Sequence, residues 1–133
     1  MEINNPEAVA EVSAAFAKYE AALISNDVET LNALFLNSPG TIRFGAAENL
    51  FGYREIAAFR AARPAAGLER TITRLEIIAY GRDAAVTAII FTRAHAPGKI
   101  GRQMQTWVRM PEGWRVAAAH VSIIEAPPSD TEG

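Results

Sequence analysis

The sequence contains no cysteine, and this absence removes several chemistries at once. Disulfides, thiol nucleophiles and thiolate metal sites are all excluded. Histidine is also scarce, with two in 133 residues, whereas a zinc or iron site needs several converging histidine or carboxylate ligands. We therefore predict no metal site and no cofactor.

Excess positive charge and long apolar runs are also missing. The formal net charge is −2 at pH 7, whereas nucleic-acid grooves and membrane surfaces need dense, unbalanced positive charge. No apolar stretch approaches the length of a membrane span. Residues 1–5 form no apolar export segment, so we expect a cytoplasmic protein without a nucleic-acid or membrane partner.

Lysine is nearly absent from the basic residues. Of 13 basic side chains only Lys18 and Lys99 are lysines, and the others are arginines, whose planar fork matches carboxylates with two hydrogen bonds. Genomic bias explains this composition as well as an anion site does. Composition alone therefore identifies no binding site.

What is present is the composition of one globular domain. Half of the residues are hydrophobic and 21% are charged, which suffices for a single buried core. We predict one domain over residues 1–127. Residues 128–133 are polar and proline-led, and we expect a flexible tail there.

The first of three predicted helices is the easiest to recognise. Asn5 can cap it, and Pro6 suits its first turn. Its apolar stripe consists of Val9, Val12, Phe16, Tyr19 and Leu23. Because Tyr19 lies on the stripe, its hydroxyl must find a partner in the interior.

The other two helices are shorter. Asn26 and Glu29 resemble a capping box at the start of the second helix. The third is predicted over 53–63, since a proline follows. Helical spacing places Arg60 and Arg63 on the same side as its apolar anchors, as at the rim of a cavity, so both are candidates for contacting a ligand.

From residue 69 onward the hydrophobic period changes to two. After short strands over 41–44 and 49–51, four long strands are predicted, over 69–80, 84–95, 100–110 and 114–125. Helices followed by strands indicate the α+β class. We expect a cone-shaped, curved antiparallel sheet with three N-terminal helices packed on its concave face, enclosing a ligand pocket.

Three positions on these strands carry candidate chemistry. Arg43 either faces solvent in a surface ion pair or is a buried cation that needs an anion. Gln105 shares a strand face with Gln103 and Trp107, and this polar face either is exposed or orients a substrate. His120 is placed on a face with Trp114, Val116, Ala118 and Ser122, as a core residue or a functional one.

Interior carboxylates are not evident. The acidic residues of the second half are predicted to lie in loops, turns or strand margins: Glu48, Glu69, Glu76, Asp83, Glu112 and Glu125. Their absence from the interior disfavours proton abstraction by a buried carboxylate.

Several segments together resemble a known family. The C-terminal WVRMPEGWR (107–115) and AHVS (119–122) resemble the nuclear-transport-factor-2-like (NTF2-like, cystatin-like) superfamily. More specifically, the AtzH-like family is resembled by TIRFG (41–45), ENLFG (48–52), FRAAR (59–63) and GRQMQTWVR (101–109). The superfamily hosts many functions, so its fold alone does not specify one.

The family resemblance implies a cofactor-independent, decarboxylating amidohydrolase that removes a carboxylate from 1,3-dicarboxyurea to give allophanate in cyanuric-acid catabolism. It also implies that Tyr19 and Arg43 are the catalytic residues. A phenol in the pocket could protonate the leaving nitrogen, and a guanidinium could hold a carboxylate or polarise the urea carbonyl. Arg60 or Arg63 could bind the second carboxylate of a small anionic substrate, with Gln105 and His120 as further substrate-binding candidates.

Two other functions stay open from the residues. One is an isomerase or dehydratase of an apolar carbonyl compound, which needs an inward carboxylate beside His120. The other is a non-catalytic binding or dimerisation domain. Apolar residues on both strand faces suit a sheet buried on both sides, so we expect a homodimer through the sheet.

Overall fold

A computed structural model describes residues 1–128 of the chain. Its helices are α1 (Pro6–Ile24), α2 (Val28–Leu34) and α3 (Tyr53–Ala62). Its strands are β1 (Ile42–Phe44), β2 (Asn49–Phe51), β3 (Thr71–Tyr80), β4 (Ala84–Thr92), β5 (Lys99–Met110) and β6 (Gly113–Glu125). No helix within residues 1–128 combines the length and the hydropathy that crossing a bilayer requires. The predicted domain end at residue 127 stays a prediction, and tail residues 129–133 lie outside the described residues.

The six strands form one curved sheet in the order β2-β1-β6-β5-β4-β3. The three helices precede the long strands, which confirms the predicted α+β class. The hairpins are antiparallel as expected, but β1 runs parallel to β6, so the prediction of a wholly antiparallel sheet is wrong at this one contact. The chain enters β1 beside the start of β6, where Leu36 N donates to Val116 O at 2.9 Å, and this common starting point makes the pair parallel.

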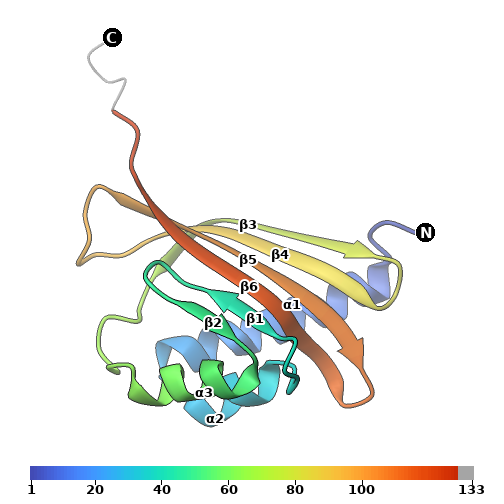
Figure 1. The fold of residues 1–133 in the computed structure, drawn as a ribbon. Helices are drawn as coiled ribbons and strands as arrows, with labels where there is room; N and C mark the ends of the chain where they lie inside the picture. Colours follow the sequence, from blue (N-terminus) through green and yellow to red (C-terminus); the bar gives the residue numbers. More distant parts are fainter. Residues whose placement is uncertain (129–133) are drawn as a thin grey trace.

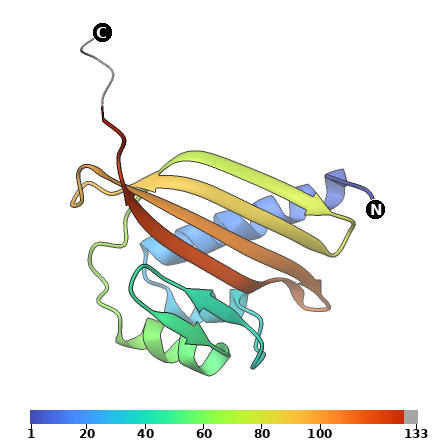
Figure 2. The same cartoon turned by 45° about the horizontal axis from the view of Figure 1, so that its top comes forward.

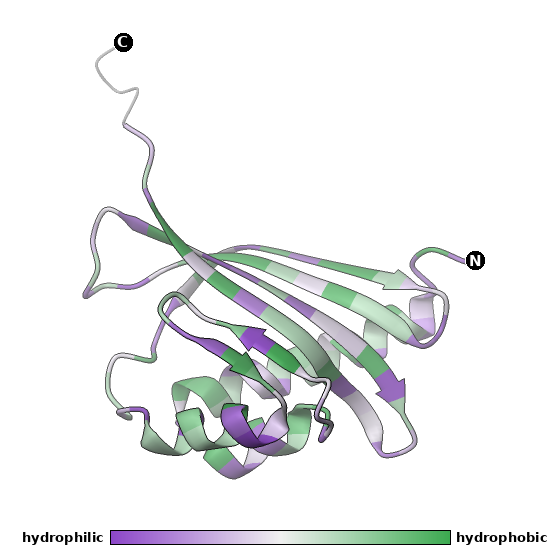
Figure 3. Cartoon of the chain, in the orientation of Figure 1, coloured by the Kyte–Doolittle hydropathy of each residue, from purple (hydrophilic) through white to green (hydrophobic). Residues whose placement is uncertain are grey.

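The helices cover one face and one end of the sheet. α1 lies along the concave face against β3, β4 and β6, and α2 and α3 lie beneath the β1–β2 hairpin (Figures 1 and 2). Hydrophobic bands recur along the four long strands, interleaved with hydrophilic ones (Figure 3). The core therefore lies between α1 and the inward-pointing residues of these strands.

The predicted start of α1 is confirmed. The Asn5 side chain accepts a hydrogen bond from Ala8 N at 3.0 Å, and Pro6 follows at the first helical position. The stripe that contains Phe16 and Tyr19 is buried against the sheet. Tyr19 therefore enters the interior from the helix side, as its spacing predicts.

The predicted cap of α2 is wrong by one residue. Asp27, not Asn26, accepts the hydrogen bond from Thr30 N, at 3.1 Å. Asn26 adopts a left-handed conformation with φ of 53°, which ends α1 and leaves the next residue to cap α2. Hydrogen bonds from the backbone and side chain of Thr30 lower the pKa of the exposed Asp27 carboxyl.

A β-bulge in β6 changes which residues face inward. Thr106 pairs with Ala118 but the next residue on β5 pairs with Val116, so Ala117 is an extra residue on β6. One extra residue shifts the alternation by one, because the side-chain period of a strand is two. Trp114 and Val116 are buried, but after the bulge the buried position is Ala119.

His120 consequently points away from the core. The prediction that it shares a face with Trp114 and Val116 is wrong, since the bulge lies between them. His120 is exposed, and its ring lies edge-on to Phe44 with 5.8 Å between the ring centroids. It belongs to the convex side of the sheet, where it is unable to reach a ligand on the concave side.

That convex side carries a continuous apolar patch. Met104 pairs in register with His120, His120 contacts Phe44, and Phe44 contacts Phe51 with 5.6 Å between the ring centroids. Met104 and Phe51 are each 56% exposed. A patch of this kind on a monomer is typical of a protein interface. The homodimer through the sheet stays a prediction, and this patch is where we place it.

We expect Met104→Glu to convert a dimer into a monomer in sedimentation equilibrium, because each subunit would bury an unpaired charge in the interface. Leu75→Glu is the matched control. Leu75 is 43% exposed but pairs with Ile89, whose side chain faces inward, so it lies on the other side of the sheet. A wild-type protein that is monomeric at micromolar concentration would contradict this interface.

Candidate functional site

A cavity of about 420 Å³ opens between α1, the end of α3 and the concave face of the sheet. Its apolar walls include Leu23, Phe59, Leu68, Phe91, Val121 and Ile123. Its charged lining consists of Arg43, Glu48, Arg63, Arg70, Arg93 and Lys99, and Tyr19 also contributes. The enclosure is therefore apolar in its walls and strongly basic in its polar groups.

The wall between β4 and β5 depends on a close contact. Phe91 and Gly101 are direct cross-strand partners, and a Cβ at Gly101 would lie 2.1 Å from the Phe91 ring. Only glycine leaves room for the ring there. The guanidinium groups of Arg70 and Arg93 lie 4.7 and 4.8 Å from the centroid of this ring, so Phe91 holds two cations beside the cavity.

Tyr19 and Arg43 both line this cavity, as the resemblance implies. Tyr19 reaches it from α1, buried between the rings of Phe16 and Phe35. Arg43 reaches it from β1, and its side chain is 12% exposed rather than directed into bulk solvent. The structure thus favours the interpretation of Arg43 as a largely buried cation.

The partner of Arg43 is Glu48. Arg43 Nη1 donates to Glu48 Oε2 at 2.8 Å, and the guanidinium lies 5.4 Å from the centroid of Phe59. Glu48 was predicted to lie in a loop away from the interior, and the second part of this prediction is wrong. The loop is correct, but the tight turn at Gly45, whose N–H donates to Glu48 O at 2.9 Å, folds the carboxylate back over β1 into the cavity.

A second ion pair was missed by sequence reasoning. Glu20 on α1 accepts two hydrogen bonds from Arg70, one of them from Nε at 3.2 Å, in a bidentate arrangement. Both side chains are largely buried. Glu20 lies one residue after Tyr19 on a helix face that its spacing predicts as solvated. Only the arrival of the segment before β3 above that face makes the pair.

Arg63 has no carboxylate partner among residues 1–128. Its Nε and Nη2 are sealed from solvent and make no hydrogen bond within this part of the chain. Burial lowers the pKa of the Arg63 guanidinium, and the nearby positive charges of Arg43 and Arg70 act in the same direction. Arg63 ends α3 in an extended conformation because Pro64 disfavours a helical one, which turns the side chain into the cavity.

Arg93, which follows the end of β4, also lines the cavity with a buried nitrogen, Nε, that lacks a hydrogen-bond partner among the described residues. Burial lowers the pKa of its guanidinium, and the charges of Arg70 and Arg63 lower it further. Sequence reasoning missed Arg93, although it follows Phe91 by two positions and the alternation along β4 therefore points it inward.

Arg60 does not line the cavity. Its Nη1 donates to Asn32 Oδ1 at 2.5 Å, and its guanidinium lies 4.7 Å from the centroid of Phe35. Burial lowers its pKa to about 10, which still leaves it charged at neutral pH. Arg60 therefore joins α3 to α2, and its predicted contact with a substrate stays a prediction.

The predicted shared face of Gln103, Gln105 and Trp107 is confirmed. All three are buried on the concave side of β5. Gln103 lines the cavity, whereas Gln105, two residues further along the strand, is not among the lining residues. Within residues 1–128, no three histidine, aspartate or glutamate side chains gather as they would to hold a metal ion.

The fold and cavity define a class of protein. A NTF2-like protein of unknown function from Pseudomonas putida superimposes with a TM-score of 0.74 at 17% identity, covering 97% of this chain and 94% of that one. A cystatin-like fold protein from Burkholderia xenovorans is 44% identical, with a TM-score of 0.91 and coverage of 96% of this chain and 99% of that one. The architecture is the NTF2-like, cystatin-like fold.

A family model also identifies the family of this chain within the class. The family model for AtzH-like proteins matches residues 1–127, and the chain belongs to the AtzH-like family. A protein of unknown function from Pectobacterium atrosepticum is 54% identical, covers 92% of this chain and 95% of its own, and has a TM-score of 0.90. No functionally curated protein matches the chain.

The buried nitrogens of Arg63 and Arg93 that lack a partner within residues 1–128 predict anion binding. We expect malonate to bind in isothermal titration calorimetry, and Arg63→Met or Arg93→Met each to weaken it by about tenfold or more, because a charge-assisted hydrogen bond is lost. Arg74→Met is the matched control, since Arg74 forms an exposed pair with Glu76 outside the cavity. Equal malonate affinity in all four proteins would contradict this assignment.

Proposed function

We propose that this protein is a cofactor-independent enzyme that decarboxylates a small N-carboxylated urea such as 1,3-dicarboxyurea, giving allophanate and carbon dioxide. The observation that carries the proposal is that Nε and Nη2 of Arg63 and Nε of Arg93 are buried without a hydrogen-bond partner among residues 1–128, in the cavity that Tyr19 also lines. The family membership established above supports the same activity.

The charge of the cavity supports a small, doubly negative substrate. Glu48 neutralises Arg43, Glu20 neutralises Arg70, and Lys99 pairs with Glu125 at 2.5 Å, which leaves Arg63 and Arg93 as the arginines of the lining without a carboxylate partner in residues 1–128. Removing a cation from water without a partner is unfavourable, and a bound anion offsets that cost. Two arginines in one cavity suit a ligand with two carboxylates.

The proposed reaction breaks one carbon–nitrogen bond. The electron pair of that bond moves to the urea nitrogen, the carboxylate carbon leaves as carbon dioxide, and the nitrogen takes up one proton. A neutral amide nitrogen is a far better leaving group than an amide anion, so the proton must arrive as the bond breaks. The Tyr19 hydroxyl is the proposed proton donor, and solvent restores its proton after product release.

Arg43 is proposed to polarise the substrate. One of its terminal nitrogens is held by Glu48, which fixes the orientation of the guanidinium and leaves the rest of the fork for a substrate oxygen. A fixed donor aimed at the urea carbonyl stabilises the negative charge that develops there as the bond breaks.

The alternative isomerase or dehydratase function loses its main support. It requires an inward carboxylate next to His120, but His120 is exposed on the convex side of the sheet. The two carboxylates near the cavity, Glu20 and Glu48, are each engaged in an ion pair with an arginine. No contact in the described residues favours this chemistry over decarboxylation.

Turnover of 1,3-dicarboxyurea, generated in situ and followed as carbon dioxide release, tests the proposal. We expect Tyr19→Phe to lower kcat by about a hundredfold or more, because general-acid catalysis is lost without a change in shape. Arg43→Ala should abolish measurable turnover. Tyr80→Phe is the matched control, since Tyr80 lies exposed on β3 outside the cavity.

Folding of each variant is checked by its circular dichroism and thermal midpoint. Wild-type protein that binds malonate but releases no carbon dioxide would reject the reaction and retain the anion site. Turnover that is indifferent to both cavity substitutions would remove Tyr19 and Arg43 from the mechanism.

A further inference from the structure

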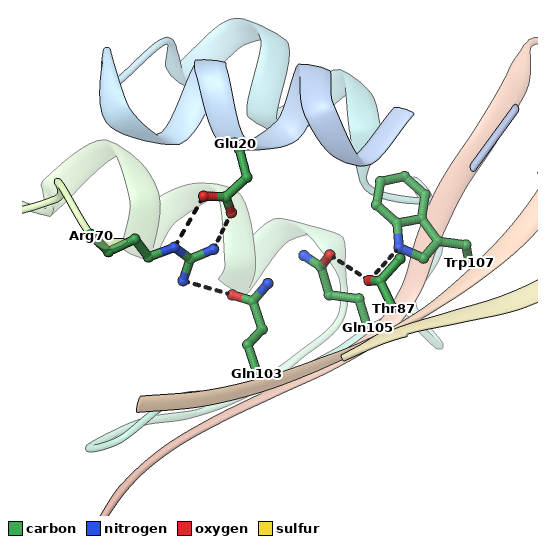
Figure 4. Close-up of polar contacts among 6 residues, drawn as sticks. All are labelled: Glu20, Arg70, Thr87, Gln103, Gln105 and Trp107. Atoms are coloured by element: carbon green, nitrogen blue, oxygen red, sulfur yellow. Dashed lines mark hydrogen bonds and ion pairs between the residues drawn. The ribbon is translucent and has the colours of Figure 1, made fainter. Parts of the chain in front are cut away.

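Two glutamine amides on the inner face of β5 have hydrogen bonds that can be assigned atom by atom. Gln103 is 3% exposed and Gln105 is 1% exposed, so little of either side chain is open to bulk water. Buried amides almost always have partners for both ends. Figure 4 shows the two side chains rising side by side from β5 toward α1.

The oxygen end of Gln105 is fixed by its neighbours. The Trp107 indole can only donate, and it donates to Thr87 Oγ1 at 3.0 Å. The Thr87 hydroxyl in turn donates its single hydrogen to Gln105 Oε1 at 3.2 Å. A reversed amide would leave that hydroxyl hydrogen facing an N–H donor, so the relay places the Gln105 NH2 group on the far side.

The oxygen end of Gln103 is fixed still more firmly. Arg70 Nη1 donates to Gln103 Oε1 at 3.2 Å, and a guanidinium has no acceptor. Arg70 itself is held in place by its two hydrogen bonds to Glu20. Reversing this amide would set donor against donor, so the Gln103 NH2 group also points away from its partner.

Both NH2 groups are therefore left over, and they face the same space. The amide nitrogens of Gln103 and Gln105 are turned toward one another in Figure 4, on residues about 7 Å apart along the strand. Gln105 Nε2 is sealed from solvent and has no hydrogen-bond partner among residues 1–128. An acceptor oxygen placed between the two nitrogens would receive a hydrogen bond from each.

We infer that Gln103 and Gln105 form a two-donor site for the neutral carbonyl oxygen of the ligand, a urea, amide or keto oxygen. This inference rests on the proposed function, because it assumes a small acid in the cavity that Gln103 lines. The division of labour follows from charge: carboxylates bind best to the guanidinium groups of Arg63 and Arg93, whereas neutral amide donors suit an uncharged acceptor.

Thr87 is then a positioning residue. It does not touch the ligand, but its hydroxyl holds the Gln105 amide in the orientation that presents NH2. Arg70 and Glu20 do the same for Gln103 and neutralise each other, so the wall that binds the carbonyl carries no net charge. The site therefore selects for a carbonyl between the carboxylates.

The test compares two dianions that differ at one position. 3-Oxoglutarate carries a central ketone between two carboxylates, and glutarate has the same chain with a methylene in its place. We expect wild-type protein to bind 3-oxoglutarate about tenfold more tightly in isothermal titration calorimetry, since two hydrogen bonds are gained. Gln105→Leu should bring this ratio close to one while changing the affinity for glutarate less than twofold.

Thr87 supplies the second pair of variants. Thr87→Val should reduce the preference for 3-oxoglutarate by several fold because the Gln105 amide is free to turn, and Thr87→Ser should restore it. A measurement on wild-type protein does not depend on whether the variants fold. In the 1H–15N spectrum, 3-oxoglutarate, unlike glutarate, should shift two glutamine side-chain NH2 signals.

The outcomes separate this inference from the proposed function. Equal wild-type affinity for the two dianions, with no NH2 shift, overturns the two-donor site and leaves the anion cavity standing. Failure of both dianions to bind overturns the two-donor site together with the proposed substrate class. A preference that survives in Gln105→Leu also rejects it, because the ketone would then be recognised elsewhere.

Discussion

The structure depends on guanidinium groups that are buried without enough carboxylates to match them. Glu20 and Glu48 hold Arg70 and Arg43, but Arg63 and Arg93 keep buried N–H groups with no partner in the described part of the chain. Taking a cation out of water is costly unless another group replaces its hydration. A fold that accepts this cost at two positions of one cavity is built to receive an anion.

The rest of the fold serves to place these charges. α1 closes the concave side of the sheet, and a proline after α3 ends that helix so that Arg63 turns inward. Gly101 lets the Phe91 ring lie flat on β5, and that ring supports two guanidinium groups. The bulge at Ala117 keeps β6 apolar toward the cavity and moves His120 to the other side. Charge is thereby concentrated on a few side chains set in apolar walls.

Much of this arrangement follows from local sequence, and the exceptions have physical causes. Spacing alone places Tyr19 inside and pairs Gln103 with Gln105, because a helix stripe and strand alternation are local properties. The position of His120 on the convex side could not be predicted from local spacing, because a bulge is set by the pairing of two strands. The Glu20 and Glu48 ion pairs also escaped prediction, since each joins a carboxylate to an arginine that tertiary packing brings near. Arg93 was predictable from the alternation after Phe91.

The central claim is that an anion completes this cavity, and a crystal structure with bound malonate tests it most directly. The account predicts one ligand between α1 and the sheet, with carboxylate oxygens about 2.7–2.9 Å from guanidinium nitrogens of Arg63 and Arg93, the spacing of charge-assisted hydrogen bonds. Malonate bound only elsewhere, with both guanidinium groups hydrogen-bonded to carboxylates of the protein itself, would contradict it.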